Sequence, residues 1–185
     1  MKELSLNILD ITENSTKARA TLIKIELKET EDTLEIVISD DGCGMTKDVL
    51  KGVQNPFYTT RTTRKVGLGI PLLKMAAEQT GGSFKITSKS EKEFGDHGTK
   101  VSAIFYKNHL DFTPLGDVVA TITTLIQGHP DTDFYFSHKF CQNEVTLDTR
   151  QMREMLGEVP LNSYEVIKWV EEYLREQYSN LYIIN

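Results

Sequence analysis

The chain has 185 residues, and its 27 Asp and Glu outnumber its 21 Lys and Arg, which gives a net charge of −6. This length allows one full domain plus a smaller second unit, and the acidic balance argues against a nucleic acid as the main partner. The sequence has no apolar run that could span a bilayer, no apolar secretory leader and no metal-binding spacing of its two cysteines, so we expect a cytoplasmic protein without a membrane partner.

Apolar periodicity predicts the elements of the first 106 residues. Leu4, Ile8 and Ile11 recur at helical spacing, whereas Thr33–Ser39 alternates apolar and polar residues as a half-buried strand does. Helices are predicted over residues 3–18, directly after Met45 and over 67–80, and strands over 21–27, 33–39, 83–90 and 98–106.

Between the second and third predicted helices, residues 54–66 show no period. They contain Pro56, two aromatic residues and three basic residues. A loop of this length without secondary structure of its own is typical of a lid over a binding site. We therefore expect this segment to close over a ligand.

Residues 109–185 differ in composition and form a second predicted unit, which resembles no family known to us. Its hydrophobicity is too high for a structureless tail, so we expect it to pack against the first unit. Turn residues are expected at His138 and Lys139. The aromatic residues Trp169, Tyr173 and Tyr178 either dock a partner or fill the core between the units, and the core is the commoner place for them. Helices are predicted over 115–127, 149–156 and 163–178, and strands over 132–136 and 143–148.

Two polar residues share one face of the first predicted helix. Asp10 and Asn14 are four residues apart, so their side chains project from the same side. An amide oxygen can bind Mg²⁺, which keeps water and phosphate oxygens as its other ligands. A nearby carboxylate can orient or deprotonate a water or a hydroxyl. Taken alone, however, such a pair is more often part of a solvated helix face.

A predicted strand ends at Asp40 and leads into a stretch that contains Gly42, Gly44 and Met45. A carboxylate at the strand end can accept a hydrogen bond from the amino group of adenine, and the glycines let the backbone approach the base closely. The same residues would also suit a simple Asp-Gly hairpin turn. The stretch therefore indicates a nucleotide site only together with other signals.

Two later glycine pairs add to this pattern. Gly67 and Gly69 open a predicted helix, whose free N–H groups would attract a phosphate. Gly98 and Thr99 open the last strand of the first unit, where a hydroxyl could support the Asp40 carboxylate. Either pair alone is a weak signal, because glycines also start helices and strands that bind nothing.

In chain order, these features are a helix with Asn, a strand with Asp-x-Gly-x-Gly, a lid, a Gly-x-Gly helix start and a strand with Gly-Thr. This order resembles the Bergerat-fold ATPases, which include DNA gyrase, the ninety-kilodalton heat-shock chaperone, histidine kinases and the mismatch-repair ATPase. The resemblance covers residues 3 to about 106, and the lid sequence NPFYTTR at 55–61 is similar to the histidine-kinase branch. It implies an α+β fold: a two-layer α/β sandwich with helices on one face of a mixed sheet, an ATPase domain at 1–108 and a small α/β C-terminal extension at 109–185.

The resemblance also assigns roles by position. It implies that Asn14 binds Mg²⁺ and that Asp40 binds adenine, and it puts Asp10 in the place of a catalytic base, where relatives often have Glu. Val66 departs from the family, which commonly has a Gly-Thr or Gly-Ser pair before Gly-Leu-Gly. The other implied ATP-binding residues form the pocket wall, the lid, the phosphate helix and the support of the adenine contact: Gly42, Gly44, Met45, Phe57, Thr60, Arg61, Gly67, Leu68, Gly69 and Thr99.

A histidine kinase also needs a dimerising helical hairpin with a phosphoacceptor histidine, and none precedes the first predicted helix. His109 resembles that motif, but it follows the ATPase unit, so we expect it in a linker. We therefore predict a Mg-ATP-dependent protein kinase or regulator in signal transduction that acts on a separate partner protein, as the anti-sigma-factor kinases of the superfamily do. A non-catalytic ATP-dependent switch and a slow ATPase stay open as alternatives. The expected partners are ATP or ADP and a protein, with no nucleic acid and no membrane.

Overall fold

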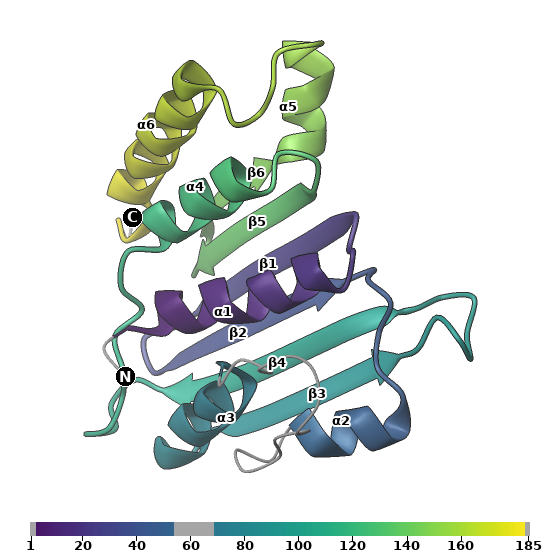
Figure 1. Ribbon diagram of the computed structural model, residues 1–185. Coiled ribbons are helices and arrows are strands. Elements are labelled where there is room, and N and C mark those ends of the chain that lie inside the picture. The colour runs from purple at the N-terminus through teal and green to yellow at the C-terminus, as the bar shows by residue number, and fades with distance from the viewer. Residues whose placement is uncertain (1–2, 54–68, 184–185) are drawn as a thin grey trace.

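The computed structural model describes residues 3–53 and 69–183, and this part of the chain forms six helices and six strands (Figure 1). Most boundaries lie close to those predicted from the sequence. In chain order the elements are α1 (Leu4–Lys17), β1 (Leu22–Glu29), β2 (Thr33–Asp40), α2 (Lys47–Val53), α3 (Gly69–Gln79), β3 (Ser83–Lys89), β4 (Gly98–Tyr106), α4 (Val118–Gly128), β5 (Asp133–Phe140), β6 (Asn143–Asp148), α5 (Thr149–Leu156) and α6 (Tyr164–Leu181).

The strands of the described chain belong to one sheet in the order β3-β4-β2-β1-β5-β6. β1 pairs in parallel with β5, and the other neighbouring strands pair antiparallel. Helices α1, α3 and α4 lie together on one face of this sheet (Figure 1). The predicted α+β class, a mixed sheet with helices on one face, is therefore confirmed. Within the described residues, no helix combines the length and the hydropathy that crossing a membrane requires.

The core lies between the sheet and this helix layer, and strand alternation decides which side chains enter it. In β1, the side chains of Ile23, Ile25 and Leu27 are fully buried, whereas the alternate residues Lys24 and Lys28 are exposed. Successive strand residues point to opposite faces, so one face of the sheet is apolar and the other is solvated. The buried face is the one that α1 covers.

Residues 109–185 extend the same sheet and pack against the first unit. β5 pairs with β1 along the whole length of β1, and α4 packs against both α1 and α6. The connection before α4 also completes the start of α1, because the N–H groups of Leu4 and Ser5 donate to the carbonyls of Pro114 (2.9 Å) and Leu115 (2.8 Å). A helix start leaves roughly four N–H groups without an intrahelical partner, and the C-terminal part supplies two partners here.

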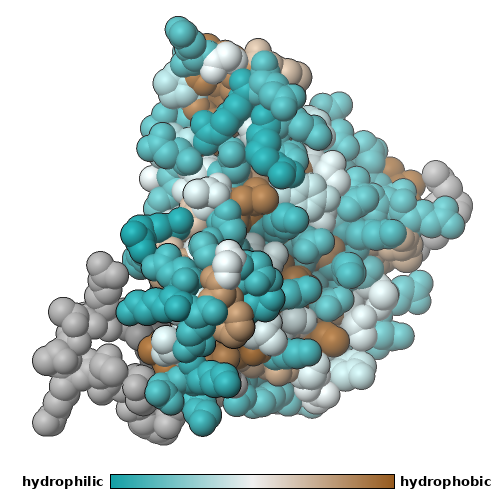
Figure 2. Space-filling view, turned by 90° about the vertical axis from the view of Figure 1, so that its right-hand side faces the viewer, coloured by the Kyte–Doolittle hydropathy of each residue, from teal (hydrophilic) through white to brown (hydrophobic). Residues whose placement is uncertain are grey.

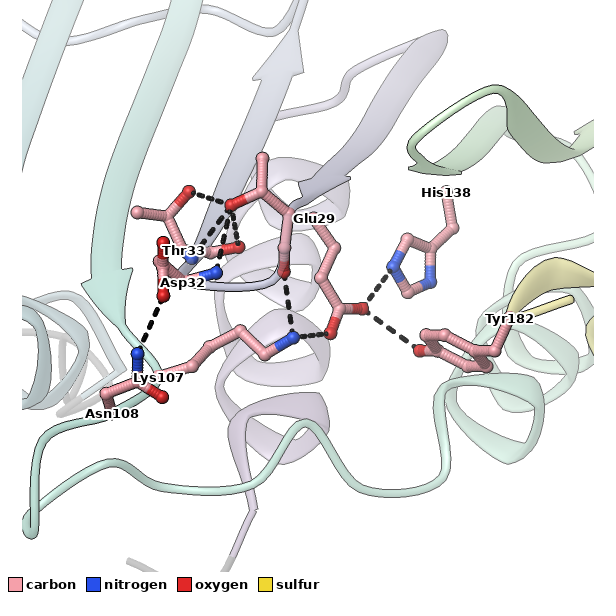
Figure 3. A network of polar contacts seen from close by, with 8 residues as sticks. Glu29, Asp32, Thr33, Lys107, Asn108, His138 and Tyr182 are labelled. Atoms are coloured by element: carbon pink, nitrogen blue, oxygen red, sulfur yellow. Dashed lines mark hydrogen bonds and ion pairs between the residues drawn. The ribbon is translucent and has the colours of Figure 1, made fainter. Parts of the chain in front are cut away.

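A polar network joins the far end of β1 to the C-terminal helix (Figure 3). Glu29 accepts a hydrogen bond from Lys107 Nζ at 2.5 Å, and its other oxygen lies 3.0 Å from His138 Nε2 and 3.0 Å from the Tyr182 hydroxyl. The fully buried His138 ring also lies 2.9 Å from the Tyr178 hydroxyl through Nδ1. Burial by itself raises the pKa of Glu29, but hydrogen bonds from His138, Lys107 and Tyr182 outweigh this effect and lower the pKa to about 2.

The start of α4 differs from the prediction. The helix begins at Val118 and not at Leu115, because Gly116 adopts a φ of 80° and Asp117 accepts a hydrogen bond from the N–H of Ala120 at 2.9 Å. Asp117 is therefore the N-cap, and the apolar Leu115 before it packs against the core from the connection. Apolar character alone placed Leu115 in the helix.

The length of β5 also differs from the prediction. The strand continues to Phe140, so His138 and Lys139 lie in a strand and the expected turn there is wrong. The predicted strand ended at Phe136, which left His138 in a turn. His138 is buried, because Glu29 and Tyr178 supply hydrogen-bond partners for its ring. Both partners are distant in sequence, so no local pattern predicts them.

Candidate nucleotide-binding site

A pocket of about 650 Å³ opens between α1, α2, the start of α3 and the ends of β2 and β4. Asn14, Asp40 and Thr99 are among its polar lining residues, and Lys17 is the basic residue in the described lining. An apolar pocket with a few convergent polar groups is typical of a site for a flat organic ligand. The apolar part of the lining consists of Ile11, Ala18, Ile38, Met45, Val49, Val53, Ile70 and Val101.

The carboxylate of Asp40 is held by donors from three segments. Its Oδ1 accepts the N–H of Gly42 at 3.0 Å and the N–H of Thr99 at 3.2 Å, and its Oδ2 accepts the hydroxyl of Ser15 at 2.5 Å. The β2–β4 register pairs Asp40 with Thr99, which explains why these two predicted residues meet. A carboxylate offers about four acceptor positions, so one position stays open to a donor in the pocket.

Two serines that the sequence analysis missed complete this arrangement. Ser15 lies on α1 directly after the predicted metal ligand and is 4% exposed. Ser88 donates to the carbonyl of Gly98 at 3.0 Å, lies 2.8 Å from the Thr99 hydroxyl and accepts the N–H of Met45 at 2.8 Å. Ser15 could have been identified from the sequence, because it directly follows Asn14 on the predicted helix. The role of Ser88 depends on the β3–β4 register, in which it lies opposite Thr99.

The loop after β2 depends on a close backbone approach. Gly44 has a φ of 63°, and a Cβ at this position would overlap the carbonyl of Lys89. The neighbouring Cys43 donates its N–H to the carbonyl of Ala18 at 2.9 Å, and its own carbonyl accepts the N–H of Glu91 at 2.9 Å. The loop is therefore fixed to α1 on one side and to the residues after β3 on the other, and only glycine suits position 44.

Asp41, the second carboxylate of this stretch, does not line the pocket. Its Oδ1 accepts the N–H groups of Thr21 at 2.7 Å and Leu22 at 3.0 Å. Burial raises the pKa of Asp41, but hydrogen bonds from Leu22 and Thr21 outweigh it and lower the pKa. Asp41 therefore fixes the start of β1, while Asp40 faces the pocket.

Asp10 and Asn14 of α1 lie near the start of α3. Asp10 contacts Gly69 so closely that a Cβ on the glycine would overlap the Asp10 carboxylate. Asn14 lines the pocket, and its Nδ2 is buried without a hydrogen-bond partner among the described residues. The Asn14 amino group can thus donate to a ligand in the pocket, while its amide oxygen is the atom that a metal ion would bind.

This arrangement bears on the expected Mg²⁺ ion. The described residues hold no group of three or more His, Cys, Asp or Glu that could bind a metal by itself. A single amide oxygen in the pocket wall matches Mg²⁺, because this ion keeps several waters and takes phosphate oxygens from a bound substrate. Asn14 therefore suits a magnesium ion that arrives with a nucleotide.

The predicted site residues fall into three groups. Five lie directly in the pocket wall: Asn14, Asp40, Gly44, Met45 and Thr99. Three stand next to it and contact each other or its wall: Asp10, Gly42 and Gly69. Five lie outside the described residues, as does the rest of the predicted lid: Phe57, Thr60, Arg61, Gly67 and Leu68.

Comparison with known proteins links these residues to a family. The family described as "Histidine kinase-, DNA gyrase B-, and HSP90-like ATPase" matches residues 1–109. Sporulation kinase C of Bacillus subtilis is 29% identical over 94 residues, which make up 50% of this chain and 21% of that protein. Sensor histidine kinase ZraS of Salmonella typhimurium is 34% identical over 71 residues, or 38% of this chain and 15% of that protein. The chain thus spans about a fifth or less of the length of these relatives.

Two solved structures share the fold. The structure "Aquifex aeolicus MutL ATPase domain complexed with ADP" has a TM-score of 0.52 at 13% identity and covers 93% of this chain and 88% of that chain. The N-terminal domain of a DNA repair protein has a TM-score of 0.55 at 16% identity and covers 79% of this chain and 52% of that chain. At these identities the likeness concerns the fold alone. In the first case it extends beyond the residues that match the family.

Proposed function

Because the chain belongs to the family of histidine kinase-, DNA gyrase B- and HSP90-like ATPases, it carries an ATP-binding domain, and we propose that it uses Mg-ATP to phosphorylate or otherwise regulate a separate partner protein. The observation that carries this proposal is a carboxylate, Asp40, held by three donors at the wall of an apolar pocket. The two relatives that are named as kinases support the phosphotransfer part of the proposal. We keep the expected cytoplasmic location, with no nucleic acid and no membrane as partner.

In this proposal, Asp40 accepts a hydrogen bond from the exocyclic amino group of adenine. The donors on Asp40 fix the direction of its remaining acceptor position, so the base is bound in one orientation. Gly44 and Met45 form the wall beside the ring, and Thr99 and Gly42 support the carboxylate.

The phosphates extend toward α3. The first N–H groups of this helix, beginning at Gly69, suit an anion because they lack intrahelical partners and carry the positive end of the helix dipole. The amide oxygen of Asn14 would hold Mg²⁺, which supplies charge neutralisation of the phosphates when bound. Asp10 would orient the attacking group, and the lid residues Phe57, Thr60 and Arg61, with Gly67 and Leu68, stay a prediction.

Selectivity among nucleotides tests the adenine contact in the unmodified protein. Guanine presents a carbonyl oxygen where adenine presents an amino group, so Asp40 would face an acceptor and not a donor. Calorimetric titration with Mg²⁺ present should give an affinity for ATP at least roughly tenfold higher than for GTP, which corresponds to about 1.4 kcal/mol. Equal affinities for the two nucleotides would overturn the assignment of Asp40.

Label from γ-labelled ATP separates the kinase from its alternatives. Transfer to another protein supports the kinase, whereas partner binding that depends on ATP without label transfer supports a non-catalytic switch. Release of labelled phosphate without a partner supports a slow ATPase. His109 lies in the turn after β4, and we expect no stoichiometric label on it; labelling abolished by His109→Ala would show autophosphorylation instead.

A further inference from the structure

A second hollow lies at the opposite edge of the sheet from the nucleotide pocket, between α5 and α6. It has a volume of about 510 Å³. Its floor consists of the buried side chains of Met152 and Val166, and its walls remain in contact with solvent. Met155 is 77% exposed, Val159 49% and Trp169 48%. Figure 2 shows this apolar area at the top of the molecule, framed by hydrophilic side chains.

Among the described residues, the charges around this hollow that form no ion pair are acidic. Glu165 lines it, and Glu154 and Glu158 adjoin the lining residues Met155 and Val159 in sequence. None of these three carboxylates forms an ion pair within the part of the chain that the structure describes. The nearby cations, in contrast, have acidic partners: Arg150 pairs with Asp148, Arg153 with Asp133 and Lys168 with Glu172.

The walls of the hollow are also fixed in advance. The Trp169 indole stacks on the Tyr173 ring at 5.2 Å between centroids and 12° between planes, which holds the indole as a flat wall. Ser163 lines the hollow as well, and its Oγ is buried without a hydrogen-bond partner among the described residues. A stacked aromatic wall reduces the ordering cost of binding.

We propose that this hollow docks a basic amphipathic helical segment of a partner protein. Apolar side chains of that segment would enter between α5 and α6, and its Lys or Arg side chains would meet Glu154, Glu158 and Glu165, with Trp169 available for a cation–π contact. The whole C-terminal part favours such a partner, because Asp and Glu outnumber Lys and Arg by more than two to one in residues 109–185.

A second copy of this chain suits the hollow poorly. A two-fold contact would bring the same patch of both copies together and place Glu158 and Glu165 against their own equivalents. The lining of eight residues is also small beside a standard interface of about 20–30 residues a side. A short helical segment of opposite charge avoids the contact between like charges and is small enough for a lining of this size.

The single tryptophan of the chain makes the test direct, because all indole emission comes from Trp169 in the hollow. The full chain, without nucleotide, is titrated with a synthetic helix of about 15 residues that has Leu at helical spacing and Lys elsewhere. The matched probe has Glu in place of each Lys. We expect the Leu/Lys helix to shift the Trp169 emission to shorter wavelength in a saturable way, and the Leu/Glu helix to cause no shift. No shift with either helix, or the same shift with both, would overturn the proposal.

Matched variants distinguish specific docking in the hollow from nonspecific electrostatic binding. Replacing Glu158 and Glu165 by Gln should weaken binding of the Leu/Lys helix roughly threefold to thirtyfold, since two exposed charge contacts are lost. Replacing Glu144 and Glu176 by Gln removes the same charge from exposed sites outside the hollow and should leave the affinity unchanged. An equal loss in both double variants would show a nonspecific charge effect and overturn the proposal.

Two apolar variants complete the test. Met155→Ser removes an exposed apolar side chain of the hollow and should abolish saturable binding of the Leu/Lys helix without loss of folding. Tyr164 is 76% exposed and lies outside the lining, so Tyr164→Ser should bind the same helix normally. Analytical ultracentrifugation should show that the unmodified chain is a monomer at the concentration used for the titration. A dimer that Met155→Ser dissociates would show that a second copy covers the hollow and would contradict the proposed partner.

Discussion

The β1–β2 hairpin carries a carboxylate at each end of the paired strands, and the two carboxylates differ in what surrounds them. Glu29, at the end of β1, is bound by Lys107, His138 and Tyr182, and each partner belongs to the chain itself (Figure 3). Asp40, at the end of β2, is also held by donors of the chain, but it faces a pocket of about 650 Å³. The neighbouring Asn14 amide has an unpartnered Nδ2.

The difference separates a structural cross-link from a ligand site. Buried polar groups in folded proteins are nearly always hydrogen-bonded, so the Asn14 Nδ2 donor in the wall of an open pocket is available to a ligand there. The Glu29 end has its partners and joins β1 to residues 107, 138 and 182, which lie in the connection after β4, in β5 and after α6. We therefore expect changes at Glu29 to alter stability and changes at Asp40 to alter nucleotide affinity.

Removal of the Glu29 carboxylate should give the largest effect on stability. Glu29→Ala leaves the Nε2 atom of the buried His138 ring without its partner and leaves the Lys107 ammonium only the Thr30 carbonyl, at a cost of about 3–5 kcal/mol in the free energy of unfolding. Urea denaturation measures this loss, and ATP affinity should stay unchanged at a temperature where the variant is folded. A loss below about 0.5 kcal/mol would show that the network does not join the two parts.

The pH dependence of stability tests the same carboxylate without removing its contacts. The pKa of Glu29 falls from 4.5 to about 2 on folding, so its contribution is fully present above about pH 4.5 and is lost as the pH falls toward 2. Compared with Glu29→Gln, the unmodified chain should lose up to about 3 kcal/mol over that range. Parallel curves for the two proteins would contradict the lowered pKa.

At the nucleotide end, Ser15→Ala removes one donor from Asp40. The hydroxyl lies 2.5 Å from Asp40 Oδ2, and its loss leaves the carboxylate free to turn. ATP affinity should fall by about 1 kcal/mol, or roughly fivefold, as calorimetry would show. An unchanged affinity would mean that Ser15 stabilises the fold without orienting Asp40.

At the other end, Tyr182→Phe removes one donor from Glu29 and provides the matched control. Tyr182 is about half exposed, so water can replace its hydroxyl, and the free energy of unfolding should fall by about 1 kcal/mol or less. Thermal unfolding measures this change, and ATP affinity should not move. A weaker ATP affinity in this variant would show that the two ends of the hairpin are coupled.

The sequence indicated the nucleotide end far better than the Glu29 end. Asp40, Asn14 and the glycines stand in short local patterns whose order along the chain is itself a signal. Thr99, in contrast, meets Asp40 only through the β2–β4 register, and Ser88, which was missed, meets Thr99 only through the β3–β4 register. Local patterns thus identified the groups that face a ligand and one supporting residue, Thr99, but not the supporting serines Ser15 and Ser88.

The Glu29 end could not be predicted, because its partners are far apart in the chain. His138 and Tyr182 lie 109 and 153 residues from Glu29 in the sequence. Without knowledge of its hydrogen-bond partner, a polar residue such as His138 is predicted to lie in an exposed turn. The boundaries of α4 and β5 were wrong for related reasons: the Asp117 cap shortened one element and the buried His138 lengthened the other. Tertiary contacts, not propensity, decided both.

Calorimetric titration of Mg-ATP into the unmodified chain, Asp40→Asn and Glu29→Gln tests the central claim most directly. An amide at position 40 presents a donor to the adenine amino group and loses a charge-assisted hydrogen bond, so binding should weaken by about 1.5–3 kcal/mol, or roughly 10- to 150-fold. Glu29→Gln should bind Mg-ATP within about twofold of the unmodified chain, since 29 lies outside the pocket lining. Unchanged ATP affinity in Asp40→Asn, or an equal loss in both variants, would contradict the division between a ligand-binding carboxylate and a structural one.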